Sequence, residues 1–142
     1  MSSSSRQVRD LVTVRSGDAF ANRQKLDLFE GISERTCGSR GISMYKVVIP
    51  PGGRAEPHSH RGYETAIFVL KGEIETRYGE GLAKKVVNVA GDYLFIPADV
   101  PHQPVNIGSE TAEAIVARND SSEQENVAPY DVDGGVPSAR DD

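Results

Sequence analysis

Short apolar stretches recur along this chain about every eight to twelve residues, and turns rich in glycine and proline separate them. Such spacing is typical of β-strands joined by tight turns, and no segment of helical length shows a 3.6-residue apolar period. The strands predicted in this way are 26–29, 42–49, 65–70, 74–78, 86–89, 93–96, 104–107 and 112–117. The pattern therefore predicts an all-β fold, a double-sheet jelly roll or a small barrel.

Two of the predicted strands differ in how their side chains alternate. In 74–78, apolar and charged side chains alternate, which predicts one buried face and one face in contact with water. In 65–70, both faces are apolar. We therefore expect 65–70 to lie inside a sheet, or to have its outer face covered, for example by another subunit.

Length and charge indicate one domain with polar ends. The 142 residues suit a single domain. We predict a disordered leader at 1–10, a folded domain at 11–119 and an acidic tail at 120–142 that is flexible or wraps over the surface. The tail holds seven of the 21 acidic residues, so the body is nearly neutral. Because it has no stripe of basic side chains, we expect no nucleic-acid partner.

Long apolar stretches and clustered cysteines are both missing from the sequence. No stretch approaches the about 18–20 apolar residues of a membrane-spanning helix, and the first ten residues lack the apolar segment of a secretory signal. We therefore expect no membrane contact and a cytoplasmic location. Cys37 is the only cysteine, which excludes an internal disulfide and a cysteine-rich metal site. Any bound metal must use nitrogen and oxygen ligands.

All three histidines of the chain, His58, His60 and His102, fall in two short segments rich in glycine and proline. In a strand, residues i and i+2 project from the same face, so His58 and His60 can direct both imidazoles to one point. Neutral imidazole is a good ligand for Zn, Fe, Cu and Ni. The pattern predicts a metal centre.

Two motifs surround these histidines. The first reads G-x5-H-x-H-x3-E from Gly52 through His58, His60 and Glu64, and the second reads G-x5-P-x4-H-x3-N from Gly91 through His102. They resemble the paired motifs of the cupin superfamily. The resemblance implies a double-stranded β-helix, or jelly-roll barrel, and a metal held by His58, His60, Glu64 and His102. Asp99 stands where the second motif usually has glycine, a position that Asp tolerates because it can adopt the left-handed conformation.

The spacing of the first motif leaves its carboxylate ligand open. In the usual motif Glu lies seven residues before the closing glycine, whereas Glu64 lies eight before Gly72. Regular strand geometry would turn Tyr63 and Thr65 inward and Glu64 outward, but a β-bulge near 61–64 would return Glu64 to the metal. We favour Glu64 as the fourth ligand. The alternatives are Tyr63, as a cavity residue or weak ligand, and water alone.

Further residues are candidates for the surroundings of the metal. Gln103 adjoins His102 and is expected to point away from the metal, where it could at best support a ligand. The remaining candidates share large apolar or aromatic side chains in predicted strands, and they suit either a cavity lining or a plain core. They are Met44, Tyr45, Phe68, Tyr93 and Phe95.

Three functions are compatible with such a centre. The amino-acid sequence in and around the motifs resembles small single-domain cupins, including the zinc-dependent aromatic polyketide cyclases. This resemblance implies a homodimer and a metal that acts as Lewis acid in ring closure of an aromatic or polyketide-like small molecule. The alternatives are a cupin dioxygenase and a cupin that binds metal or metabolite without catalysis. We expect one divalent transition metal ion, Zn first, with Fe, Mn, Ni or Cu possible.

Overall fold

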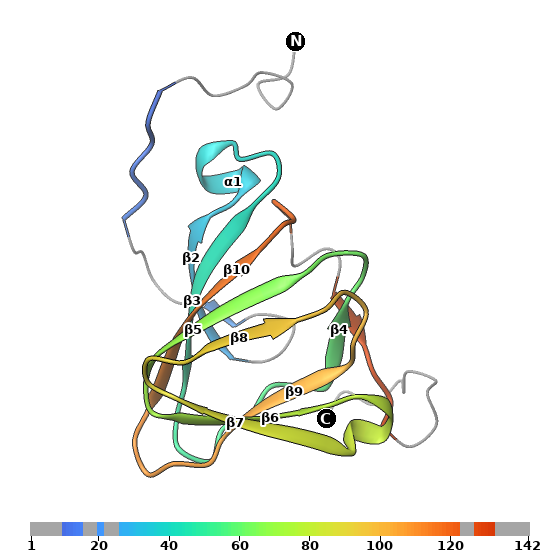
Figure 1. Ribbon diagram of the computed structural model, residues 1–142. Helices are drawn as coiled ribbons and strands as arrows, with labels where there is room; N and C mark the ends of the chain where they lie inside the picture. Colours follow the sequence, from blue (N-terminus) through green and yellow to red (C-terminus); the bar gives the residue numbers. More distant parts are fainter. Residues whose placement is uncertain (1–9, 16–19, 22–25, 123–126, 133–142) are drawn as a thin grey trace.

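The computed structural model describes residues 10–15, 20–21, 26–122 and 127–132, which fold into two antiparallel sheets (Figure 1). The strands are β1 (Phe20–Ala21), β2 (Asp27–Ile32), β3 (Ser43–Ile49), β4 (His58–His60), β5 (Thr65–Lys71), β6 (Glu73–Tyr78), β7 (Lys84–Val89), β8 (Tyr93–Ile96), β9 (His102–Asn106), β10 (Ala112–Arg118) and β11 (Val127–Pro129). The first sheet has the order β1-β2-β3-β10-β5-β8, and the second has the order β11-β4-β9-β6-β7. The predicted all-β jelly roll is confirmed.

Each predicted strand overlaps an observed one, and the described residues add β1, β4 and β11. These three strands have only two or three residues, too few for an alternating pattern to be recognised. A one-turn helix α1 (Glu34–Cys37) and a 3-10 turn η2 (Glu80–Leu82) complete the described elements. The strand predicted for 65–70 is β5, which lies inside its sheet between β10 and β8.

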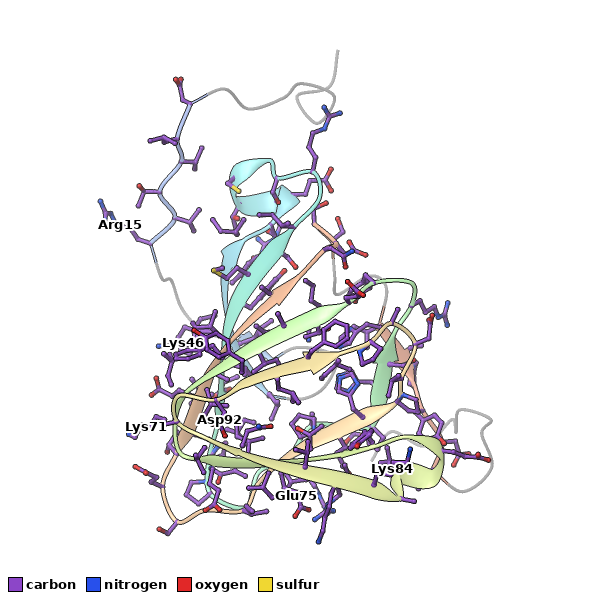
Figure 2. All side chains as sticks on the ribbon, viewed as in Figure 1. Arg15, Lys46, Lys71, Glu75, Lys84 and Asp92 are labelled. Carbon is purple, nitrogen blue, oxygen red and sulfur yellow. The ribbon has the colours of Figure 1, made fainter. Side chains whose placement is uncertain are left out.

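The hydrophobic core is built mainly by the first sheet, and Ile74 of β6 joins it from the second. Figure 2 shows side chains of both sheets reaching into the space between them. Side chains alternate along β3, so that Tyr45, Val47 and Ile49 are buried while Met44 is exposed. Aliphatic residues of β5 and β10 meet them from the same sheet. The inward faces are thus mainly aliphatic, which leaves a dry interior around the few polar groups placed there.

Two positions hold the ends of the strands together. Asn106 is 1% exposed, and its amide nitrogen donates to the carbonyl oxygens of Ile49 at 2.8 Å and Glu110 at 2.9 Å, while its side-chain oxygen accepts from the Gly108 amide. Gly72 has φ +86°, and a Cβ there would lie 2.8 Å from Cα of Ala112. The hydrogen bonds of Asn106 hold the chain where β9 ends, and the close approach of Ala112 leaves room only for glycine in the turn between β5 and β6.

Part of the acidic tail forms an edge strand of the second sheet. The strand β11 pairs with β4, with Val127 opposite His60 and Pro129 opposite His58. The Tyr130 amide donates to the carbonyl oxygen of Pro57, and the Tyr130 hydroxyl accepts from the Gly81 amide. The predictions for 1–9, 123–126 and 133–142 lie outside the described residues. Of the helices in the described part, none has the length and apolar character needed to cross a membrane.

Candidate metal centre

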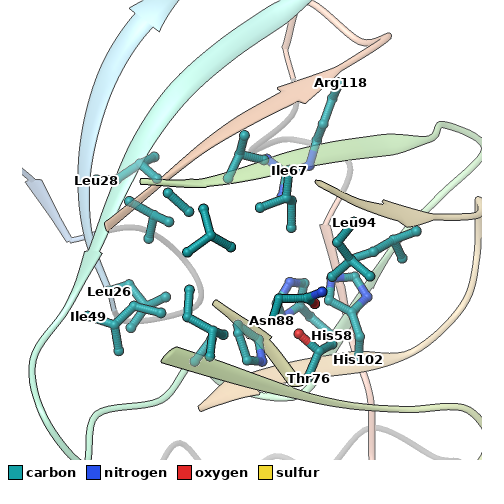
Figure 3. A pocket seen from close by; sticks show the side chains of 18 residues that line it. Leu26, Leu28, Ile49, His58, Ile67, Thr76, Asn88, Leu94, His102 and Arg118 are labelled. Carbon is teal, nitrogen blue, oxygen red and sulfur yellow. The ribbon is translucent and has the colours of Figure 1, made fainter. Parts of the chain in front are cut away.

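The strands β4 and β9 bring the three histidines together. His58 and His60 share the inward face of β4, and His102, the first residue of β9, lies directly opposite His58. The three residues are 4%, 2% and 3% exposed. One ring nitrogen of each lies within 4.8 Å of the others, close enough for one ion to bind all three. Figure 3 shows His58 and His102 side by side at one end of a cavity.

Hydrogen bonds at Nδ1 fix the orientation of two of the rings. Nδ1 of His58 lies 2.6 Å from the carbonyl oxygen of Glu56, and Nδ1 of His102 lies 2.9 Å from that of Val100. Because a carbonyl oxygen only accepts, each Nδ1 carries the hydrogen. The lone pair of each neutral ring is therefore on Nε2, the nitrogen available to a metal.

His60 has the same tautomer for a different reason. Its Nε2 lies 3.2 Å from Nη2 of Arg118, and its Nδ1 lies 2.9 Å from the Tyr63 hydroxyl. A guanidinium group only donates, so Nε2 of His60 is the acceptor and Nδ1 donates to the Tyr63 oxygen. All three histidines thus hold their lone pairs on Nε2.

Burial keeps the three imidazoles neutral at physiological pH. Loss of solvation is the main cause that lowers the pKa of each ring, and it brings the pKa of His102 to about 4. The positive charge of Arg118 also lowers the pKa of His60 strongly. Metal binding needs deprotonated imidazole, and the fold supplies it without a neighbouring base.

Asp99 joins the two motif segments. It has φ +66°, so the prediction that Asp accommodates the left-handed conformation at this position is confirmed. Its amide donates to the carbonyl oxygen of His60 at 3.0 Å, and its side-chain oxygen accepts from the Gly62 amide at 3.1 Å. The turn after His60 is thereby tied to the loop before His102.

The residue expected as fourth ligand, Glu64, does not face the histidines. Tyr63 is 3% exposed and Thr65 is 1% exposed, whereas Glu64 is exposed to solvent and its amide donates to the side chain of Asn119. Arg61 and Gly62 form a turn between β4 and β5 rather than a bulge. Buried and exposed side chains alternate through 63–65, just before and at the start of β5, and it is Tyr63, not Glu64, whose side chain contacts His60.

A mainly aliphatic cavity extends from the histidines between the sheets (Figure 3). Arg118, Thr76 and Asn88 add polar groups to its wall, and no Asp or Glu is among the described residues that line it. A second hollow shares His102, Thr76, Leu94 and Ile96 with the first. Their free volumes are about 60 and 210 Å³, each below the roughly 300 Å³ at which typical ligand pockets begin. The space suits a compact small molecule.

Most residues expected to line this cavity lie elsewhere. Met44, Tyr93 and Phe95 are 45%, 81% and 58% exposed, because the opposite faces of their strands turn inward. Phe68 shares this outer face and packs against Tyr93, with the two ring centroids 4.7 Å apart and the rings tilted by 50°. Tyr45 is buried in the core and does not line the cavity.

Two of the expected residues have other contacts near the site. Phe95 borders the second hollow. Gln103 donates from Nε2 to the carbonyl oxygen of Ala55 at 2.9 Å, away from the three rings. Arg118 was not among the residues expected at the site, yet its Nη2 lies 3.2 Å from Nε2 of His60, the nitrogen that carries the lone pair. No motif marks it, because only the pairing of β10 with β5 brings it there.

The pair Tyr63→Phe and Glu64→Gln tests which residue supports the centre. Loss of the Tyr63 hydroxyl removes the acceptor that orients His60, so we expect zinc binding to weaken about tenfold, the lower end for such supporting groups. Glu64→Gln should leave zinc affinity unchanged, because that side chain is exposed. Competition with a chelating dye measures both. If Glu64→Gln strongly weakens zinc binding and Tyr63→Phe does not, Glu64 is a ligand after all.

Comparison with known proteins agrees with this geometry. Residues 45–118 match the model of the cupin domain family. Germin-like protein subfamily T member 3 of Arabidopsis thaliana is 33% identical over an alignment of 115 residues, and the match covers 78% of this chain and 47% of that protein. The chain thus spans about half the length of this curated relative.

Solved structures show the same fold. A recombinant oxalate oxidase in complex with glycolate is 25% identical with a TM-score of 0.64, over 77% of this chain and 57% of that chain. The polyketide cyclase RemF from Streptomyces resistomycificus is 18% identical with a TM-score of 0.67, over 91% of this chain and 89% of that chain, a likeness of fold alone. The family match, the curated relative and the paired histidine motifs agree: this chain belongs to the cupin family.

Proposed function

We propose that this protein is a metal-dependent enzyme that binds one divalent transition metal ion through His58, His60 and His102 and acts on a compact small molecule. The observation that carries the proposal is the shared tautomer of three buried, neutral imidazoles that lie close together, each with its Nδ1 in a hydrogen bond and its lone pair on Nε2. Three imidazole ligands are compatible with Zn, and also with Fe, Mn, Ni or Cu.

A divalent ion held in this way would supply a Lewis acid with open coordination positions. Residues of the chain would orient the ligands and shape the cavity around the substrate. The carbonyl oxygens of Glu56 and Val100 keep two of the rings aligned, and the aliphatic wall of the cavity excludes water from the reacting group. A carbonyl or enolate oxygen is the substrate group that suits such a site, so ring closure of a small ketone-containing compound is our first candidate reaction.

Oxidation by dioxygen is the second candidate. It is supported by the 25% identity to a solved oxalate oxidase and by the small free volume beside the histidines, which suits a small acid better than a folded polyketide chain. This reaction requires a redox-active metal such as Mn or Fe, whereas Lewis-acid chemistry works with Zn. The two candidates therefore differ in metal and in oxygen use.

Elemental analysis of protein purified without an affinity tag tests the proposal. We expect about one transition metal ion per chain. The metal-free protein is then reloaded with Zn or with Mn, and oxygen consumption is followed with oxalate, glycolate and β-diketones as substrates. Oxygen uptake with Mn only would favour the oxidase. Conversion without oxygen would favour the Lewis acid, and tight metal binding with no conversion would favour a non-catalytic binding protein.

We also propose a homodimer. Two rows of cross-strand neighbours form an outer face on the first sheet that is apolar except for Lys46. The rows are Met44, Ala117, Ala66 and Phe95, and Lys46, Ile115, Phe68 and Tyr93. A second copy that covers this face would bury the aromatic side chains of Tyr93 and Phe95, which are 81% and 58% exposed in one chain. Light scattering of the full chain should give twice its 15.3 kDa mass.

A further inference from the structure

Arg118 holds one of the three lone pairs that a metal would need. It lies opposite Thr65 in the pairing of β10 with β5, and its Nε donates to the Thr65 hydroxyl at 3.1 Å. Its Nη2 donates to Nε2 of His60 at 3.2 Å. Figure 3 shows Arg118 reaching from β10 toward the cavity.

One lone pair cannot serve both partners. Nδ1 of His60 is engaged by Tyr63, so a metal must bind at Nε2, the atom that now accepts from Arg118. When a metal binds there, the guanidinium group has to leave this acceptor. The hydrogen bond from Nε to Thr65 can persist, since it does not involve His60, and it would keep the charged end of Arg118 beside the metal.

The charges at the site then favour an anion. The three histidine ligands are neutral, so a divalent ion keeps its full charge, and Arg118 adds one more positive charge next to it. Among the described residues that line the cavity, none carries a carboxylate. Two positive groups in a low-dielectric cavity repel each other and strongly attract a negative ligand. The planar fork of guanidinium matches the two oxygens of a carboxylate.

We propose that Arg118 is a specificity-determining residue that competes with the metal for Nε2 of His60 and, once the metal is bound, selects a small organic carboxylate as the ligand. The carboxylate would lie between the metal and the guanidinium group, with its apolar part against the aliphatic wall that includes Leu94 and Ile96. This inference rests on the proposed metal site and adds the class of substrate.

The variant Arg118→Met separates this role from a structural one, because it changes two affinities in opposite directions. Removal of the competing donor and its charge should tighten Co²⁺ binding roughly tenfold, while the loss of a charge-assisted hydrogen bond should weaken acetate and benzoate binding to the cobalt-loaded protein by at least about tenfold. Arg118→Lys keeps the charge and should retain part of the anion binding. The matched control Arg61→Met removes an exposed positive charge next to His60 in sequence and should change neither affinity.

Visible absorption of the cobalt-loaded full chain measures both affinities, since the spectrum responds to the ligands of the ion. The uncharged probes acetamide and benzamide should bind at least about tenfold more weakly than the acids to the wild-type protein. Equal binding of amides and acids, or an Arg118→Met protein whose cobalt and anion affinities are unchanged or both lower, overturns the role of Arg118 while the metal site stands. A wild-type protein that takes up no cobalt overturns the metal site itself and this inference with it.

Discussion

Lowering the pH from about 7.5 to about 5 should destabilise the metal-free protein by roughly 4 to 6 kcal/mol. The cause is the three buried histidines. Burial lowers the pKa of each below the ordinary value of 6.5, with that of His102 at about 4. A loss of this size is comparable with the whole stability of many small domains.

Stability falls with pH in this range because the unfolded chain binds more protons than the folded chain. Below about pH 6.5 the unfolded chain protonates its histidines, whereas the folded chain keeps them neutral. The unfolded state therefore gains protons first, and stability falls as the pH falls. Between the pKa of the unfolded chain and the lower pKa of the folded chain, each ring lowers the free energy of unfolding by about 1.4 kcal/mol for every unit that the pH falls. For His102 the loss ends near pH 4, where the folded state also takes up its proton.

Bound metal should leave in the same pH range, because protons compete for the Nε2 lone pairs. Urea unfolding at about pH 7.5, 6 and 5, with and without zinc, measures both effects. The zinc-dependent gain in the urea midpoint should disappear between pH 6 and 5. A variant such as His58→Gln lacks one titrating ring and should show a shallower slope. A urea midpoint that is independent of pH would contradict the burial of neutral histidines.

The histidine motifs could be read from the sequence, but the inward or outward choice at each strand could not. Alternation shows that Tyr93 and Phe95 share one face of β8 and that Leu94 and Ile96 share the other. It does not show which face meets the second sheet. The aromatic pair fits a cavity lining as well as the aliphatic pair does, and only the packing of the sheets turns Leu94 and Ile96 inward.

The same limit explains the two differences at the metal centre. The orientation of Glu64 depends on whether 61–64 forms a bulge or a turn, and a glycine at position 62 is compatible with both. In the structure Gly62 has φ +76° and lies in a turn. Arg118 lies 58 residues from His60 in the chain and belongs to no motif. Its place beside the ring comes from the register of β10 on β5, a long-range pairing that local patterns do not specify.

Replacing any one histidine with alanine should weaken metal binding by more than about 100-fold. Groups that merely orient a ligand are worth about 10- to 100-fold, and each of these substitutions removes a ligand outright. His102→Ala is the most informative of the three, because it also removes the direct cross-strand contact with His58. Metal content after dialysis, together with the zinc-dependent shift of the melting temperature, measures the loss.

The matched control is Gln103→Ala, one residue along β9. Its side chain bonds to the carbonyl oxygen of Ala55, away from the three rings, so zinc affinity should stay within about twofold of wild type even if stability falls slightly. Circular dichroism of each metal-free variant separates loss of a ligand from loss of fold. If a folded His102→Ala variant keeps its zinc, a centre built on three converging imidazoles cannot be correct, because the two histidines of β4 alone would then have to hold the ion.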